Sequence, residues 1–200
     1  MEKKLKSQFE KFKLLRLVLA GMIAALYVVL TLPMASFAFG IIQFRLAEIL
    51  TVLPVLSLAA VPGVFLGCLI SNVLNPQNLG LIDILCGSGA TLIAALLSYW
   101  IGNRTRTRLR QERSAVPTEL GKFQRLQNWF WRILALLPPV LINAFVVGTY
   151  LPFLTLDNPS SLEVAGSIAM IFISQAFVIF ILGLPALYAL EKVKLPIGKI

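Results

Sequence analysis

The sequence predicts an all-α integral membrane protein with six transmembrane helices and both termini in the cytoplasm. The chain of 200 residues is 58% hydrophobic and only 14% charged, whereas soluble domains are about half apolar and about a quarter charged. Its apolar stretches are long and continuous rather than alternating, which favours helices over a transmembrane barrel. Its lysines and arginines are confined to a few segments, which indicates the topology. We expect residues 1–200 to form a single transmembrane domain.

The basic residues indicate which segments lie on the same side of the membrane. All of them except Arg45 fall within residues 3–16, 104–132 and 192–199. Because cytoplasmic loops are enriched in lysine and arginine, all three segments are expected inside, and an even number of spans must separate successive segments. A hydrocarbon core about 30 Å thick needs about 20 residues per helix. Four spans therefore fit between the first two segments, and two fit between the last two.

The first three spans are predicted at residues 15–34, 41–58 and 61–74. The basic N-terminal segment and the apolar run after it resemble a signal peptide. The run extends from Leu17 to Phe39, which is too long for a signal peptide, so we interpret it as a retained span. The second and third spans are short, and we expect them to be tilted, kinked or partly shielded from lipid.

The last three spans are predicted at residues 81–101, 133–152 and 163–189. A polar turn at residues 75–80 precedes the first of them. Between the fourth and fifth spans lies a basic loop, residues 102–132, which we expect in the cytoplasm. We interpret its alternating arginines as a topology anchor that contacts anionic lipid headgroups. The alternative is nucleic-acid binding.

Polar side chains within the predicted spans indicate a pocket, because ionisable groups at membrane depth are costly and usually mark a site or face a cavity. Most of them fall at one level, in the outer half of the predicted topology, so we expect a polar pocket that opens outward. Three structural roles stay open beside it: Arg45 and Glu48 tie helices together, Asp83 caps the fourth helix, or the asparagines bond between helices. The candidates are Gln43, Arg45, Glu48, Asn72, Asp83, Ser88, Asn143, Tyr150 and Gln175.

The sequence offers little for catalysis. It contains no histidine, and Cys68 and Cys86 lack the spacing of metal ligands. It also lacks a Gly-x-Ser-x-Gly motif and a phosphate-binding loop. We therefore expect no enzymatic activity, no metal and no cofactor. Any ATP-driven function would need a partner that binds ATP.

Small residues recur at four-residue spacing in the first and third predicted spans. Such spacing lets helices approach closely. It serves either packing inside the protein or docking of another membrane subunit, and the sequence leaves both open. The pairs are Ala20 with Ala24, Gly21 with Ala25, and Gly63 with Gly67.

Several motifs together resemble the QueT family. Residues 40–48, Gly-Ile-Ile-Gln-Phe-Arg-Leu-Ala-Glu, look like the family's Ile-Gln-Phe-Arg-x-x-Glu motif. Further matches follow in the same order as in the family, and the basic loop and the tails lie outside them. They are Pro62-Gly63-x-x-x-Gly67-Cys68-x-x-x-Asn72, Asp83-x-x-x-Gly87-Ser88-x-Ala90-Thr91-Leu92, Pro138-Pro139-Val140-x-x-Asn143-Ala144-x-x-Val147-Gly148 and Leu182-Gly183-Leu184-Pro185.

The resemblance implies the substrate-binding S-component of an energy-coupling factor (ECF) transporter, an ABC-type importer of the bacterial cell membrane. Such a subunit is a bundle of six transmembrane helices without its own ATPase. It works with a transmembrane T-component and two cytoplasmic ATPases, and it topples in the membrane to release its substrate inward. S-components of this class commonly dock through an Ala-x-x-x-Ala motif on the first helix. Ala20 and Ala24 match that motif, with Gly21 and Ala25 beside them.

The implied substrates are queuine or another 7-deazaguanine, such as 7-aminomethyl-7-deazaguanine. Glu48 or Asp83 could accept the N1–H and the exocyclic amine of a guanine-like edge. Arg45 could orient Glu48 or cap a carbonyl oxygen. Residues that could supply further donors and acceptors are Asn72, Asn143 and Gln43, and rings that could stack on the base are those of Phe44, Phe145 and Tyr150.

Two further functions stay open. One is an S-component for a different vitamin-like solute. The second is a stand-alone secondary transporter of a small polar solute. Such carriers often show inverted repeats and broken helices near the midplane, and the sequence shows no convincing internal repeat.

Overall fold

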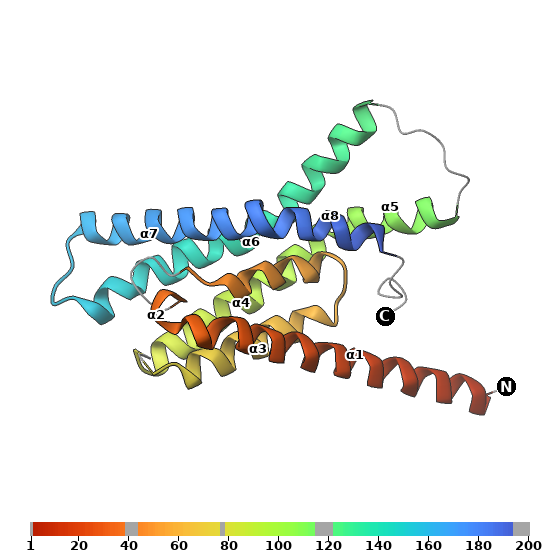
Figure 1. Ribbon diagram of the computed structural model, residues 1–200, viewed down its shortest axis with the longest axis horizontal. Helices are drawn as coiled ribbons and strands as arrows, with labels where there is room; N and C mark the ends of the chain where they lie inside the picture. The colour runs from red at the N-terminus through yellow and green to blue at the C-terminus, as the bar shows by residue number, and fades with distance from the viewer. Residues whose placement is uncertain (1, 39–43, 77–78, 115–121, 194–200) are drawn as a thin grey trace.

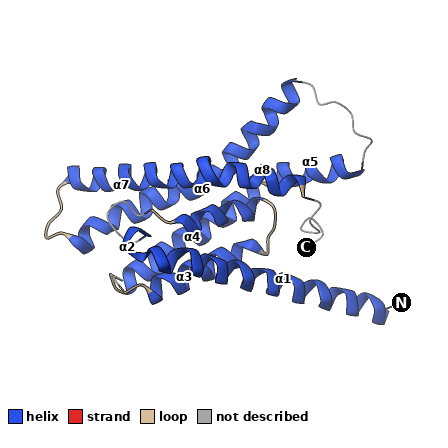
Figure 2. Ribbon diagram, viewed as in Figure 1, coloured by secondary structure: helices blue, strands red, loops and turns tan. Residues whose placement is uncertain are grey.

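The computed structural model of the chain describes residues 2–38, 44–76, 79–114 and 122–193. These residues form helices joined by short turns, with no strand among them (Figures 1 and 2). The predicted all-α fold is therefore confirmed for this part of the chain. The elements in order are α1 (Glu2–Thr31), η1 (Leu32–Met34), α2 (Ala35–Ala38), η2 (Leu46–Val55), α3 (Ala60–Leu74), α4 (Leu81–Ile101), α5 (Asn103–Ser114), α6 (Lys122–Thr155), α7 (Ser161–Ala176), η3 (Phe177–Gly183) and α8 (Leu184–Lys192).

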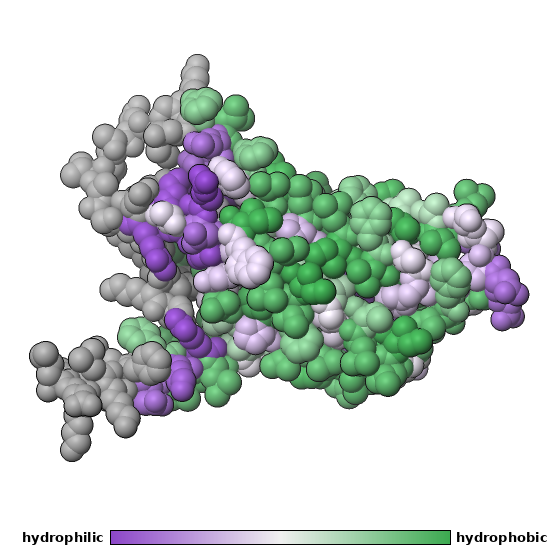
Figure 3. Space-filling model, turned by 180° about the vertical axis from the view of Figure 1, so that it is seen from behind, coloured by the Kyte–Doolittle hydropathy of each residue, from purple (hydrophilic) through white to green (hydrophobic). Residues whose placement is uncertain are grey.

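Long apolar stretches agree with four of the six predicted spans. Within the described residues, four stretches are long and apolar enough to cross a membrane. The second and third predicted spans correspond to η2 and α3, which are apolar but shorter. Figure 3 shows a broad apolar surface that lies between hydrophilic residues at two ends of the molecule. The four stretches are Glu10–Met34, Leu81–Ile101, Leu126–Thr155 and Ser161–Lys192.

The second predicted span differs from the expected helix at 41–58. Its described part is a 3-10 helix of 10 residues, η2, whose length is about 20 Å at about 2.0 Å per residue. That is well short of a hydrocarbon core about 30 Å thick. Most of its side chains are buried, so neighbouring helices shield it from lipid. The short element is tolerated because it lies inside the bundle, as the prediction of a shielded span allowed.

The helices run back and forth between two ends of the molecule. In Figure 1 the start of α1, α5, the start of α6 and the end of α8 lie at one end, which we call the basic end. η2 runs towards it, because Gly102 and Arg106, which follow α4, approach the backbone of Val55. α3 and α4 meet towards the opposite end, where Asn72 donates a hydrogen bond to Ser88 over 3.3 Å. The described parts of the three basic segments thus lie together, as the predicted topology requires.

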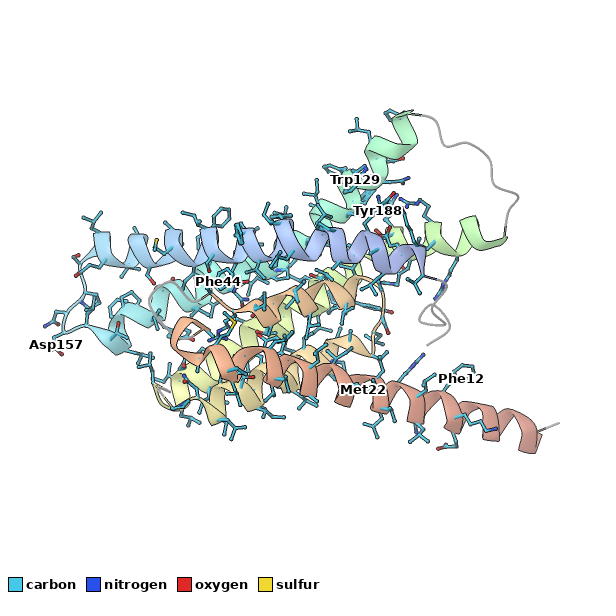
Figure 4. All side chains as sticks on the ribbon, in the orientation of Figure 1. Phe12, Met22, Phe44, Trp129, Asp157 and Tyr188 are labelled. Carbon is cyan, nitrogen blue, oxygen red and sulfur yellow. The ribbon has the colours of Figure 1, made fainter. Side chains whose placement is uncertain are left out.

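The predicted basic loop, residues 102–132, is largely helical where it is described. It contains α5 and the first turns of α6. Arg132 at its end is only 5% exposed and forms a buried ion pair with Glu191 of α8. The Nε atom of Arg132 lies 3.0 and 2.9 Å from the two carboxylate oxygens, and Nη2 also donates to Oε2. Beside the pair, the rings of Trp129 and Tyr188 stack with centroids 5.6 Å apart (Figure 4). This end of the loop therefore ties α6 to α8.

Two of the small-residue pairs pack against each other inside the protein. A Cβ atom on Gly63 would lie 2.9 Å from the carbonyl oxygen of Ala20. A Cβ atom on Gly67 would lie 3.1 Å from the carbonyl oxygen of Ala24 and 2.5 Å from Cβ of Tyr27. The absence of side chains at both glycines lets α1 and α3 approach closely. Ala20 and Ala24, predicted from the resemblance to dock a partner, are therefore buried within this chain.

The second small pair on α1 faces outward. Gly21 and Ala25 are exposed, and a Cβ atom on Gly21 would meet nothing within 4 Å. Met22 beside them is 65% exposed and projects from the bundle in Figure 4. Of the predicted docking residues, these two remain on the surface.

Candidate functional site

Glu48 lies in the first turn of η2 and is only 1% exposed. Its Oε1 atom accepts a hydrogen bond of 2.7 Å from the hydroxyl of Tyr27 on α1. Its Oε2 atom is buried and has no hydrogen-bond partner among the described residues. A buried acceptor without a partner is costly, by about 1–3 kcal/mol and more for a charged group. The free oxygen is therefore suited to a donor that the described residues do not supply.

Arg45 precedes η2 and holds two neighbouring elements together. Its Nε atom donates to the carbonyl oxygen of Ala38 over 3.0 Å, and Nη1 lies 3.8 Å from the sulfur of Cys68. The sequence predicts that Arg45 orients Glu48 or caps a carbonyl oxygen. Its Nε atom donates to the carbonyl oxygen of Ala38, and Tyr27 donates a hydrogen bond to the Glu48 carboxylate. Through its contacts with Ala38 and Cys68, Arg45 joins the end of α2 to α3.

A second group of polar side chains joins α3 to α4. The amide nitrogen of Asn72 donates to Ser88 over 3.3 Å and lies 3.7 Å from the sulfur of Cys68. Thr91 donates to the same sulfur over 3.3 Å. The Oδ1 atom of Asn72 is buried without a hydrogen-bond partner in the described structure. Like Glu48, Asn72 therefore presents a buried acceptor that no described donor fills.

Asp83 and Tyr150 form a third contact at the same level. The hydroxyl of Tyr150 on α6 donates to Oδ1 of Asp83 over 2.7 Å. Asp83 is 2% exposed, so it is not the solvent-exposed helix cap that the sequence left open, and Gly80 occupies the cap position of α4. A Cβ atom on Gly87 would lie 3.1 Å from Nδ2 of Asn72 and 3.3 Å from the Tyr150 hydroxyl. The side chains of Asn72 and Tyr150 therefore both lie next to Gly87, which has no side chain of its own.

These contacts define one set of side chains, which we call the polar cluster. Its members come from α1, η2, α3, α4 and α6 and converge towards the end of the molecule opposite the basic end. They offer several acceptors and few free donors, which suits a ligand rich in N–H groups. The members are Tyr27, Arg45, Glu48, Cys68, Asn72, Asp83, Ser88, Thr91 and Tyr150.

The remaining predicted site residues make none of the contacts that define the polar cluster. Asn143 on α6 and Gln175 on α7 are buried, and their amide oxygens have no hydrogen-bond partner among the described residues. The ring of Phe44 lies against Phe177, with centroids 6.2 Å apart. Phe145 is 60% exposed on the outer face of α6, which argues against the predicted stacking on a bound base. Gln43 falls outside the described residues.

Three members of the polar cluster were not predicted as site residues from the sequence. Tyr27, Cys68 and Thr91 are moderately polar side chains in apolar runs, where ordinary packing is the simpler interpretation. Helical spacing offered a signal, since Asn72 follows Cys68 by four positions and Thr91 follows Gly87 by four. Within the described residues, no group of three His, Cys, Asp or Glu side chains could hold a metal ion.

Comparisons with known proteins identify the family of the chain. A family model described as QueT transporter matches residues 17–192. The Queuosine precursor transporter QueT of Lactococcus lactis subsp. cremoris (strain MG1363) is 31% identical over 97 residues, which is 48% of this chain. The matched part spans 56% of that relative's length. No solved structure matches the chain. With its apolar spans, the chain is a multi-pass protein of the bacterial membrane, and it belongs to the QueT transporter family.

Proposed function

We propose that this chain is the substrate-binding S-component of an ECF-type importer and that its substrate is a queuosine precursor. The transporter family and the name of the Lactococcus relative support the transport of such a precursor. The observation that carries the proposal is the buried carboxylate of Glu48. One of its oxygens accepts a hydrogen bond from Tyr27, and the other has no partner among the residues that the structure describes.

The base edge of a 7-deazaguanine complements that carboxylate. It presents N1–H and an exocyclic amine side by side, and a carboxylate can accept from both. The free Oε2 of Glu48 would accept the hydrogen bond from the exocyclic amine. Because the Tyr27 hydrogen bond already holds the carboxylate in place, little further ordering is needed on binding.

Asp83 and Asn72 would complete the recognition. A 7-aminomethyl group is cationic, and the buried carboxylate of Asp83 would neutralise it. The free Oδ1 of Asn72 would accept a further N–H. Gly87 leaves space between these two side chains, because any larger residue would reach both Asn72 and Tyr150. Queuine and other 7-deazaguanines share the base edge, so this scheme covers them as a class.

The topology of the proposal has six spans with the basic end in the cytoplasm. The four long stretches would each be long enough to cross the membrane, and the shorter helices η2 and α3 would cross within the bundle. Lysine and arginine enrichment supports a cytoplasmic basic end. The polar cluster then lies in the outer half of the membrane, where it would take the substrate from outside.

Partner docking would use the exposed small pair on α1. Gly21 and Ala25 offer a surface to which another transmembrane helix can come close, whereas Ala20 and Ala24 are occupied by α3. The partners would be a T-component and two ATPases that supply the energy for release. If uptake of the precursor persisted in cells without those partners, the chain would act as a stand-alone secondary transporter instead.

Binding to a panel of solutes tests the substrate. Purified full-length chain in detergent would be titrated by calorimetry with queuine, 7-aminomethyl-7-deazaguanine, guanine and unrelated vitamins. The proposal expects saturable binding of the 7-deazaguanines and at least about tenfold weaker binding of guanine and the vitamins. Tight binding of a vitamin with no response to any 7-deazaguanine would contradict it and would favour an S-component for another solute.

Copurification tests the partners independently of the substrate. An affinity-tagged chain expressed in its own host should bring down one further membrane protein and two ATPases. Gly21→Leu should reduce their recovery without changing substrate binding, because the added side chain would project from the exposed face of α1. Recovery that is unaffected by Gly21→Leu would place the docking face elsewhere.

A further inference from the structure

A cavity of about 440 Å³ lies at the basic end, between α5 and the start of α6. Two arginines of α5, Arg104 and Arg108, line one side of it, and Gln127, Asn128 and Trp131 of α6 line the other. None of the described residues around it is acidic. The cavity therefore combines positive charge, amide donors and one aromatic wall. It is far from the polar cluster and takes no part in the contacts described there.

The helix that supplies the arginines is held in a fixed orientation. Arg106 points away from the cavity, and it donates hydrogen bonds of 2.7 Å to the carbonyl oxygens of Val55 and Tyr99. Its guanidinium also lies 3.9 Å from the centroid of the Tyr99 ring. Arg106 thus caps the end of η2 and anchors α5 to the bundle. Arg104 and Arg108, one helical turn apart, are left on the cavity side.

The spacing of the donors suits a phosphate group. Side chains four positions apart on a helix have Cβ atoms about 5–6 Å apart, so two guanidinium groups can bind one phosphate from the same side. Arginine binds phosphate oxygens through paired N–H donors. The Arg104 guanidinium already lies 4.9 Å from the centroid of the Trp131 ring, which helps to hold it at the cavity wall.

The cavity lies at the edge of the apolar surface. Trp100, at the end of α4, is 67% exposed, and Phe130 and Ile133 of α6 are also exposed. Tryptophan concentrates at the boundary between lipid chains and headgroups. A phosphate in the cavity would therefore sit at headgroup depth, with apolar side chains next to it to receive acyl chains.

We propose that this cavity binds the headgroup phosphate of an anionic phospholipid, with Arg104 and Arg108 as phosphate ligands and Trp131 as the wall at the glycerol level. Such a lipid would fasten α5 to the membrane surface. The proposal concerns a different site from the polar cluster, so it stands or falls independently of the proposed substrate.

Native mass spectrometry of the full-length chain tests this site. The chain would be titrated with dioleoyl phosphatidylglycerol and, separately, with dioleoyl phosphatidylcholine, which has the same chains and no net charge. The proposal expects saturable binding of phosphatidylglycerol and several-fold weaker binding of phosphatidylcholine. Arg104→Gln and Arg108→Gln should each weaken phosphatidylglycerol binding about fivefold. Trp131→Leu, which leaves the charge unchanged, should also weaken it.

Arg110→Gln is the matched control, because it removes one charge from the same helix at a position that does not line the cavity. It should change phosphatidylglycerol binding by less than about twofold. Equal losses in Arg104→Gln and Arg110→Gln, with none in Trp131→Leu, would mean diffuse attraction to the membrane and would overturn the site. If soluble glycerophosphoglycerol, or an RNA oligonucleotide at similar concentrations, displaced the lipid, the occupant of the cavity would not be a phospholipid.

Discussion

The basic end and the polar cluster both bury charged side chains, but they differ in how completely those charges are paired. At the basic end, Arg132 and Glu191 form several hydrogen bonds with each other, so each charge is met by its partner. In the polar cluster, Glu48 receives one hydrogen bond from Tyr27, and its other oxygen has no partner in the described part of the chain. A paired buried charge costs a great deal when it loses its partner, whereas an unpaired acceptor can gain from a new one. The first arrangement maintains the fold, and the second is available to a ligand.

The largest expected effect is on stability, at the basic end. Arg132→Leu should destabilise the chain by about 3–5 kcal/mol, because it leaves the Glu191 carboxylate buried without a partner. Equilibrium unfolding in detergent, followed by circular dichroism, measures the loss. The double variant Arg132→Leu with Glu191→Leu should recover most of it, since both charges are then gone. If the single and double variants were equally unstable, the pair would not be the reason.

Glu48→Gln should show the opposite pattern. The substitution should leave the free energy of unfolding unchanged or slightly raised, because it removes an incompletely paired buried charge. Affinity for 7-aminomethyl-7-deazaguanine should fall by about 1.5–3 kcal/mol, the typical strength of a hydrogen bond to a charged group. Calorimetry measures the affinity. Glu163→Gln is the matched control, since Glu163 is exposed in the capping box that begins α7. An unfolding defect in Glu48→Gln with normal affinity would make Glu48 structural.

Gly67→Ala should lower both the stability of the chain and its affinity for the ligand. The new Cβ atom would lie 2.5 Å from Cβ of Tyr27, so α1 and α3 would have to separate. Overpacking of this kind costs about 1–3 kcal/mol. It should also weaken ligand binding, because Tyr27 orients Glu48. Gly21→Ala, on the exposed face of the same helix as Tyr27, should leave binding unchanged. If the Gly67→Ala protein were destabilised but bound the ligand normally, Tyr27 would not be part of the binding site.

Thr91→Val should have the smallest effect, because we expect Thr91 to lie beside the ligand-binding side chains without contacting the ligand. The hydroxyl of Thr91 donates to the sulfur of Cys68 and lies 3.1 Å from the carbonyl oxygen of Gly87. Its loss should cost about 0.5–1 kcal/mol in stability, as for an ordinary hydrogen bond. Thermal unfolding and calorimetry together measure both quantities, and affinity should change by less than about twofold. A loss of affinity above about tenfold would show that Thr91 itself touches the ligand.

The fold was predictable where apolar runs end in turn residues. The predicted spans 61–74 and 81–101 agree closely with α3 and α4, because a polar Asn-Pro turn lies between them and Gly102 follows. The 3-10 form of η2 was not predictable, since it depends on how neighbouring helices enclose the segment. The buried pair of Arg132 and Glu191 was also missed. Its members are 59 positions apart, and Arg132 looks like one more cation of a basic loop.

The candidate site was predictable to the extent that its residues are unusual in apolar runs. Glu48, Asp83 and Asn72 are rare types at membrane depth, and the structure places all three in the polar cluster. Tyr27 was missed because a tyrosine in a membrane helix is common and its role depends on where Glu48 lies. Composition thus identifies the acceptors, and three-dimensional proximity is needed to identify which side chains orient them.

The most direct test of base recognition by Glu48 is a cycle that removes one side of the proposed hydrogen bond at a time. Affinities would be measured by calorimetry for 7-aminomethyl-7-deazaguanine and for its analogue with hydrogen in place of the exocyclic amine. Each ligand would be tested on the unaltered chain and on Glu48→Gln. We expect the analogue to bind at least about tenfold more weakly to the unaltered chain. On Glu48→Gln the two ligands should bind about equally. The same ratio of affinities on both proteins would contradict the claim that Glu48 reads the base edge.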